Sequence, residues 1–166
     1  MKRPIRIEGN IAYVPLTKGY EAVIDAADVP LAEGFSWHAN VQSHAVYAQR
    51  KDRSGPKPRT VLLHRVIAGE PEGFDIDHRD GNGLDNRRAN LRDATKAQNQ
   101  HNARISKRNT SGFKGVMRNN RNSKWQAMIG LNRKQHHLGF FNCPTAAYFA
   151  YIKASRALHG EFGRIA

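Results

Sequence analysis

Asp77, His78, Asn90 and Asn99 are the residues of this chain whose types and spacing could do chemistry. An adjacent acid and histidine come first, and two asparagines follow at fixed intervals further along the chain. A neutral histidine can take a proton from water near pH 7. A carboxylate and an amide oxygen are hard ligands that suit Mg²⁺ or Mn²⁺ and leave positions open for phosphate and water. These residue types therefore predict metal-assisted hydrolysis of a phosphodiester.

Two short strands and a helix must position these residues. Residues 74–77 predict a strand. Because neighbouring side chains of a regular strand point to opposite faces, the chain has to leave the sheet at residues 79–83 if Asp77 and His78 serve one site. Leu91-Arg92 predicts the second strand. Thr95 to Gln98 matches the capping box that opens a helix, which places Asn99 at the end of the first turn of a compact β-β-α unit.

This unit resembles the HNH endonuclease motif, in the variant of phage and intron-encoded homing endonucleases that ends in asparagine. The resemblance rests on Asp77-His78, Asn90-Leu91 and Asn99, with Leu63-His64-Arg65 before them and Asp80-Gly-Asn82 and Asp85-Asn-Arg87 between them. It implies a ββα-metal (His-Me finger) fold in which Asp77 and Asn99 ligate one divalent cation, Mg²⁺ or Mn²⁺. It also implies that His78 is the general base, that Asn90 pins the loop orienting His78, and that products carry 5′-phosphate and 3′-hydroxyl ends.

The remaining polar residues of the stretch have other interpretations. Asp80, Asn82, Asp85 and Asn86 are of the types that form Asx turns, and we assign them to turn geometry. His64 is interpreted as a structural or supporting residue. A calcium-binding EF-hand loop is disfavoured because the twelfth position of either register is not glutamate.

The distribution of charge points to a polyanionic partner. The net charge is +13, but residues 1–60 hold 9 Lys/Arg against 6 Asp/Glu, residues 61–100 hold 6 against 7, and residues 101–166 hold 12 against 1. Basic residues that neutralise phosphates release condensed counterions, so nucleic acid is the natural partner. The predicted metal site lies in the acidic middle. A basic surface without a partner remains the alternative.

Further composition bounds the class of protein. The chain has no run of 18 apolar residues and no apolar segment behind its basic start, so we expect neither a membrane span nor a secretory signal. The single cysteine, Cys143, excludes an internal disulfide and a multi-cysteine zinc site, which fits a reducing cytoplasm.

The N-terminal residues 1–60 predict short antiparallel strands. Ile5–Ile7 and Ile11–Val14 flank a Gly9-Asn10 turn, residues 21–24 and 45–48 are further strand candidates, and residues 51–58 are a loop. Trp37, His38 and His44 are interpreted as packing or surface residues. The apolar segment 61–67 suits either a strand or a short helix.

The C-terminal residues 113–166 predict three strands and a helix. The strands are 113–118, 124–131 and 136–141, and the helix opens near Pro144 with an apolar face made of Ala147, Ala150, Tyr151, Ala154 and Leu158. His136 and His137 are expected on the surface, because strand neighbours point apart.

This module resembles the plant Apetala-two/ethylene-response-factor (ERF) DNA-binding domain. The resemblance rests on Lys-Gly-Val at 114–116, Lys124-Trp125 in strand two and Leu-Gly-Phe-Phe at 138–141. It implies a sheet in the DNA major groove, with contacts from Arg118, Arg121, Lys124, Trp125 and Arg133. Trp125 could equally belong to the core.

The sequence therefore predicts an α+β protein: N-terminal antiparallel strands (1–60), a ββα-metal nuclease domain (61–102), a basic linker (103–112) and an ERF-like sheet plus helix (113–166). The expected function is a metal-dependent DNA endonuclease of homing type, from a phage or mobile element, acting as a monomer on double-stranded DNA in the cytoplasm. No membrane and no small-molecule cofactor is expected. The alternatives are a DNA-binding regulator with an inactive nuclease unit and, less well supported by the few aromatic residues, an RNA-binding protein.

Overall fold

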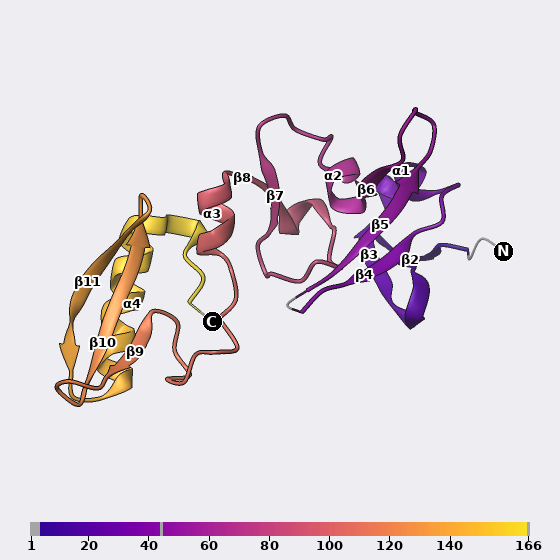
Figure 1. Cartoon of the computed structure of the whole chain (residues 1–166). Coiled ribbons are helices and arrows are strands. Elements are labelled where there is room, and N and C mark those ends of the chain that lie inside the picture. Colours follow the sequence, from indigo (N-terminus) through magenta and orange to yellow (C-terminus); the bar gives the residue numbers. More distant parts are fainter. Residues whose placement is uncertain (1–3, 44, 166) are drawn as a thin grey trace. The chain divides into compact units, whose positions relative to one another are not determined.

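The computed structural model describes residues 4–43 and 45–165, and the chain divides into two compact units, Met1–Lys96 and Ala97–Ala166 (Figure 1). The first unit opens with an antiparallel sheet in the order β1-β2-β3, formed by β1 (Arg6–Glu8), β2 (Ile11–Pro15) and β3 (Glu21–Asp25). The predicted hairpin around Gly9 is confirmed: Glu8 pairs with Ile11, and Gly9 takes the positive φ of 58° that favours glycine at such a turn.

A second antiparallel sheet follows a short helix, α1 (Val29–Ala32). Its strands are β4 (His38–Val41), β5 (Val46–Asp52) and β6 (Arg59–Leu62), in the order β4-β5-β6. The segment 61–67 turns out to be both of its predicted alternatives, because β6 ends at Leu62 and α2 (Leu63–Ile67) begins at the next residue.

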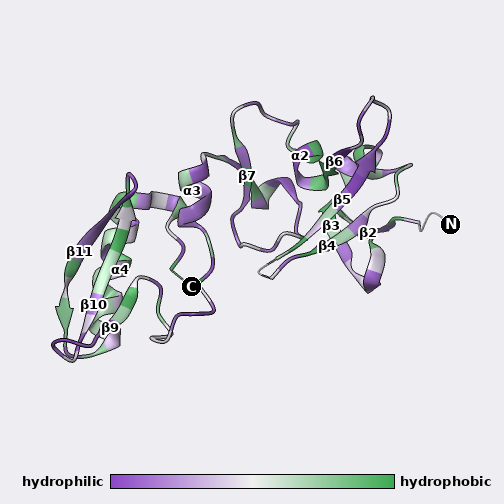
Figure 2. Cartoon of the chain, viewed as in Figure 1, coloured by the Kyte–Doolittle hydropathy of each residue, from purple (hydrophilic) through white to green (hydrophobic). Residues whose placement is uncertain are grey.

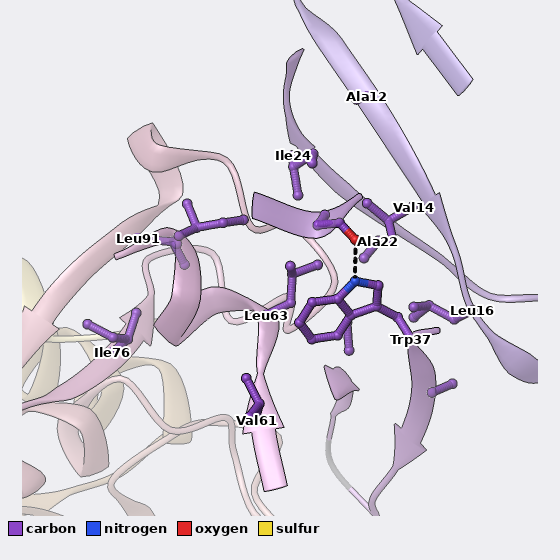
Figure 3. Close-up of a cluster of buried hydrophobic side chains, with 14 residues drawn as sticks. Ala12, Val14, Leu16, Ala22, Ile24, Trp37, Val61, Leu63, Ile76 and Leu91 are labelled. Carbon is purple, nitrogen blue, oxygen red and sulfur yellow. Dashed lines mark hydrogen bonds between the residues drawn. The ribbon is translucent and has the colours of Figure 1, made fainter. Parts of the chain in front are cut away.

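One hydrophobic core joins both sheets to the strand segments Asp75–His78 and Leu91–Ala94. Figure 3 shows Val14, Ala22 and Ile24 of the N-terminal sheet pointing toward the same core as Val61 and Leu63, and Ile76 and Leu91 belong to it as well. Trp37 is buried there as expected, and its indole Nε1 donates to the Ala32 carbonyl at 2.9 Å. His38 is exposed, whereas His44 lies outside the described residues. The compact unit thus combines two of the predicted segments, 1–60 and most of 61–102.

The predicted β-β-α elements are present. β7 (Asp75–His78) pairs antiparallel with β8 (Leu91–Ala94), and α3 (Lys96–His101) begins directly after Thr95. The segment between the two strands, from Arg79 to Asn90, is a long loop that ends in a short 3₁₀ turn (Arg88–Asn90). We call residues 79–90 the β7–β8 loop.

The second unit is a three-stranded antiparallel sheet with a helix. The strands β9 (Val116–Asn119), β10 (Lys124–Leu131) and β11 (Lys134–Phe141) lie in the order β11-β10-β9. Figure 2 shows β11 changing from hydrophilic at its start to hydrophobic at its end. The helix α4 (Pro144–His159) is capped by Cys143, whose Sγ accepts from the Ala146 amide.

The buried face of α4 differs from the predicted one. Ala147 and Tyr151 are buried as expected, but the same stripe continues through Ser155 and His159. Leu158 was expected on this face and is instead 44% exposed. The buried face follows residues spaced four apart because the end of the helix is anchored. His159 donates from Nε2 to the Gly130 carbonyl at 2.8 Å, which fixes the rotation of the last helical turn. The small core beneath the sheet is built on Val116, Ala127 and Ala147.

The predicted fold class is confirmed: the protein is α+β, with N-terminal antiparallel sheets, a central β-β-α region and a C-terminal three-stranded sheet with a helix. In the described part of the chain, no helix is both long enough and apolar enough to cross a membrane.

Candidate active site

Asp77 and His78 end β7 as buried residues, exposed by only 4% and 5%. In the strand register Asp77 lies opposite Arg92 and His78 opposite Leu91. The chain then turns away from the sheet, because the Gly81 amide donates to the His78 carbonyl at 2.8 Å and Gly81 takes a φ of 70°. The exit from the strand that the sequence demanded is therefore present directly after His78.

Asn90 ties the two ends of the β7–β8 loop together. Its Oδ1 accepts from the Asp80 amide at 3.1 Å, and its Nδ2 donates to Asp80 Oδ1 at 2.9 Å and to the Asp85 carbonyl at 2.8 Å. Its own carbonyl accepts from the Arg79 amide at 2.9 Å. A side-chain amide can satisfy donors and acceptors at once, which suits it to closing a loop. These contacts close the loop, and the role of Asn90 in orienting His78 stays a prediction.

Asn86 contacts His78 directly, and the sequence interpretation missed it. Asn86 is fully buried, and its Oδ1 lies 3.2 Å from His78 Nε2. Its Nδ2 donates to the Leu84 carbonyl at 3.0 Å, which fixes the orientation of the amide. Because an amide oxygen only accepts, Nε2 of His78 must carry the hydrogen, and the neutral ring then has its lone pair on Nδ1. Asn86 therefore sets the tautomer of His78.

Two further rings surround His78. The ring centroid of His64 lies 5.0 Å from that of His78 in an edge-on arrangement, and Tyr47 lies 5.7 Å from His64 and 5.9 Å from His78. Burial, with a contribution from His78, lowers the pKa of His64 to about 3. Burial also lowers the pKa of His78, against the opposing effects of the Asn86 hydrogen bond and of the Asp80, Asp77 and Asp85 carboxylates. Both imidazoles are therefore neutral at pH 7.

The N-terminal sheet holds the β7–β8 loop in place. The Val23 amide donates to the Leu84 carbonyl at 2.8 Å, and the Asn86 amide donates to the Val23 carbonyl at 2.7 Å. Val23 and Asp85 thus form an isolated parallel bridge. Further along, the Arg88 guanidinium pairs with the buried Asp28 carboxylate at 2.7 Å.

β5 supports the other side of the same loop. A Cβ added to Gly83 would lie 2.5 Å from the Val46 carbonyl oxygen and 2.6 Å from the Tyr47 ring. Only glycine allows so close an approach of two backbones. Two strands from residues 1–60 therefore shape a loop that the sequence placed in a separate nuclease segment.

Asp77, the predicted metal ligand, already has a cationic neighbour. Its Oδ2 accepts from Arg92 Nε at 2.8 Å and from Nη2 at 2.6 Å, and both side chains are almost completely buried. Among the described residues, no group of three or more His, Cys, Asp or Glu side chains could hold a metal ion. Three carboxylates nevertheless lie near enough to His78 to raise its pKa. Carboxylate oxygens are the ligand type that divalent cations prefer, but Asp77 and Asp85 are each paired with an arginine, Arg92 and Arg87.

Comparison with known proteins identifies the family. The family model of HNH endonucleases matches residues 61–101. Protein 3.8 of Escherichia phage T7 is 35% identical over 94 residues, which are 57% of this chain and 77% of that protein. The chain belongs to the protein 3.8 family and carries an HNH endonuclease domain. No solved structure gives a significant match.

Asn99, the last predicted residue of the HNH motif, lies on α3 within the second compact unit. The end of α3 is fixed inside that unit. Lys114 Nζ donates to the His101 and Ala103 carbonyls at 2.6 and 2.7 Å, and the His101 ring stacks on His159 with centroids 3.6 Å apart. Burial and the nearby Arg164 lower the pKa of Lys114 to about 8. The ligand role of Asn99 stays a prediction.

The predicted DNA contacts beyond the HNH domain fall on different sides of the C-terminal sheet. Arg118 pairs in register with Trp125, its guanidinium lies 5.2 Å from the Trp125 ring, and Trp125 packs partly buried against the core under α4. The opposite face carries Met117, Gln126 and Phe140, of which Met117 is 52% and Phe140 45% exposed. Arg121 and Lys124 lie at one hairpin end and Arg133 at the other.

The two histidines of β11 are exposed, as predicted, and His137 Nδ1 lies 3.1 Å from Gln126 Nε2. The comparisons give no support for an ERF-like domain in residues 113–166. That assignment and the five DNA contacts stay predictions.

Proposed function

We propose that this protein is a metal-dependent DNA endonuclease of homing type, with His78 as the general base. The observation that carries the proposal is the buried pair of His78 and Asn86, 3.2 Å apart, inside the segment matched to HNH endonucleases. A neutral histidine held in one tautomer can remove a proton from water without reorganisation.

The residues around His78 have different roles in the proposed reaction. His78 Nδ1 takes a proton from the attacking water, while Asn86 holds the ring through Nε2. Asn90 keeps the loop closed through its contacts with Asp80 and Asp85. Tyr47 and His64 pack against the base and keep bulk water away from it.

A divalent cation, Mg²⁺ or Mn²⁺, would be held by the Asp77 carboxylate and the Asn99 amide oxygen. When bound, it supplies positive charge to the phosphate and the leaving oxygen. Arg92 has a role in this arrangement that needs no metal. It fixes the direction of the Asp77 carboxylate and offsets part of the cost of burying that charge.

For the C-terminal unit we propose double-stranded DNA binding. The support is the charge of residues 101–166, with 12 basic residues against one acidic residue, and the placement of basic residues at both ends of an open sheet face. Arg121, Lys124 and Arg133 would grip phosphates. Because Arg118 and Trp125 pair on the side of α4, we expect their substitution to weaken binding less than that of the hairpin residues.

Plasmid cleavage tests the enzymatic proposal. Supercoiled DNA is incubated with Mg²⁺ and either the wild-type chain, His78→Ala or the control His38→Ala, which removes an exposed histidine. We expect the wild type and the control to produce open circles first, as a monomer with one site would, and His78→Ala to lose at least about 100-fold in rate. If the wild type binds DNA but leaves several substrates intact, the alternative of a DNA-binding regulator with an inactive nuclease unit is correct instead.

A further inference from the structure

The hairpin formed by β5 and β6 carries an excess of positive charge that the proposed catalytic site does not use. Its residues 50–59 include five basic side chains and one acidic one, Asp52. Asp52 is neutralised within the hairpin, because Arg59 Nε donates to its Oδ2 at 2.8 Å and Ser54 donates twice to its Oδ1. The other four basic side chains of the hairpin are therefore not paired with Asp52.

Two of these basic residues, Arg53 and Lys57, lie at the tip of the hairpin. Arg53 and Lys57 are exposed, and neither makes a hydrogen bond or ion pair with the rest of the described chain. In contrast, Arg50 lies 4.0 Å from the Phe35 ring centroid, and Lys51 donates to Thr60 at 2.7 Å. Arg53 and Lys57 are thus the side chains available to a partner.

The base of the hairpin lies at the β7–β8 loop. β5 begins with Val46 and Tyr47, which touch the position of Gly83, and the Tyr47 ring is 5.9 Å from that of His78. From there the strand runs away from the loop to the tip (Figure 1). At roughly 3.3 Å per residue, the strand from Tyr47 to Asp52 spans about 17 Å, or about five base pairs at roughly 3.4 Å per step.

We propose that the β5–β6 hairpin is an arm that grips the DNA backbone beside the scissile phosphate, with Arg53 and Lys57 as its phosphate contacts. This inference rests on the proposed nuclease function, because it takes its partner from the substrate of the catalytic site. The arm is independent of the C-terminal unit, since both strands belong to the first unit.

The tip chemistry points to phosphates in preference to bases. Residues 53–58, Arg-Ser-Gly-Pro-Lys-Pro, contain no amide side chain that could read an adenine edge. Arg53 and Lys57 could reach guanine only in a fixed bidentate geometry, whereas a phosphate contact needs only their charge. Long cationic side chains on an exposed turn suit the regularly spaced charges of a duplex. The arm therefore adds affinity that is independent of sequence and sensitive to salt.

Equilibrium binding measures this contribution. His78→Ala serves as the background, so that duplex DNA stays intact with Mg²⁺ present. The double variant Arg53→Gln with Lys57→Gln should make the slope of the logarithm of the DNA association constant against the logarithm of salt concentration less negative by about 1.8. Its affinity for DNA at about 0.1 M salt should fall by roughly 10- to 60-fold. The control, Lys153→Gln with Arg156→Gln, removes the same net charge from exposed positions of α4. These two residues are not among the proposed phosphate contacts Arg121, Lys124 and Arg133, so the slope should change by less than half a unit.

Hydroxyl-radical footprinting on the same proteins locates the contact. We expect protection of the backbone for about five base pairs on one side of the cut, and its loss in the hairpin variant alone. An unchanged footprint, or a slope equal to that of the α4 control, overturns the arm. If His78→Ala still cuts DNA, the assignment of the base fails, whereas a hairpin-dependent footprint in that experiment still supports the arm.

Discussion

Replacing Asn86 tests whether one buried amide controls the protonation of His78, the proposed general base. In Asn86→Ala, the buried His78 Nε2 loses its hydrogen bond to Asn86, whereas the Leu84 carbonyl still accepts from the Val23 amide. A buried polar group that loses its partner costs about 1–3 kcal/mol, so we expect the free energy of unfolding to fall by about that amount. The ring also loses its fixed tautomer, and kcat should fall by about 100-fold, equivalent to about 2.7 kcal/mol in the barrier.

The Asn86→Asp variant separates tautomer control from charge. A carboxylate still accepts from Nε2, so the lone pair stays on Nδ1, but the added negative charge raises the pKa of His78. Because the base acts only when neutral, the acid limb of the rate profile should move to higher pH. In the wild type, burial lowers this pKa, which places the acid limb below the ordinary histidine value.

The assay is cleavage of a labelled duplex at saturating DNA between pH 5 and 9, with thermal unfolding recorded for each variant. Asn82→Ala is the matched control, because Asn82 belongs to the same loop, caps the Leu84 amide and does not touch His78. Its rate should stay within threefold of the wild type. Should Asn86→Ala be folded at the assay temperature and cut within threefold of the wild-type rate, the tautomer argument is refuted.

Three further results are expected. Gly83→Ala should lower kcat by at least 10-fold while DNA affinity stays within twofold of the wild type. The reason is that the added Cβ would meet the Val46 carbonyl oxygen at 2.5 Å and displace the loop, and an unchanged kcat would contradict this. His64 has a pKa of about 3 in the folded protein and near 6.5 in the unfolded chain. Its contribution to the free energy of unfolding should therefore fall by about 1.4 kcal/mol per pH unit as the pH drops below 6.5. His64→Phe should remove this contribution to the pH dependence measured by urea unfolding. EDTA should abolish cleavage while leaving DNA binding in gel shifts, and added Mg²⁺ should restore it; cleavage that persists in EDTA excludes metal dependence.

The elements of the catalytic region were predictable because their signals are local. Adjacent Asp77 and His78 forced an exit from a strand, and a turn at Gly81 provides it. Asn90 could be singled out by its spacing, and its contacts with Asp80 and Asp85 agree with a loop-closing residue. Periodicity also predicted every strand of the C-terminal sheet to within a few residues.

What sequence patterns did not reveal depends on contacts between distant segments. Asn86 looked like one more turn residue in a run of Asp, Asn and Gly, and only the backbone of Val23, far earlier in the chain, brings it into the interior beside His78. Tyr47 carried no signal at all, since a tyrosine in a short strand is ordinary packing. Leu158 was misplaced because helical periodicity does not fix the rotation of α4, which depends on His159 and Gly130.

The parallel bridge between Val23 and Asp85 has a consequence for recombination within this gene. The segment that matches the HNH family, 61–101, contains the proposed site residues but neither β3 nor β5, which contact its loop. If that segment alone were transferred to another protein, the loop would lack these contacts, so we expect a functional transfer to include β3 and β5. The unit that folds around the proposed site is therefore larger than the motif, and the strands that precede the motif are synthesised before it.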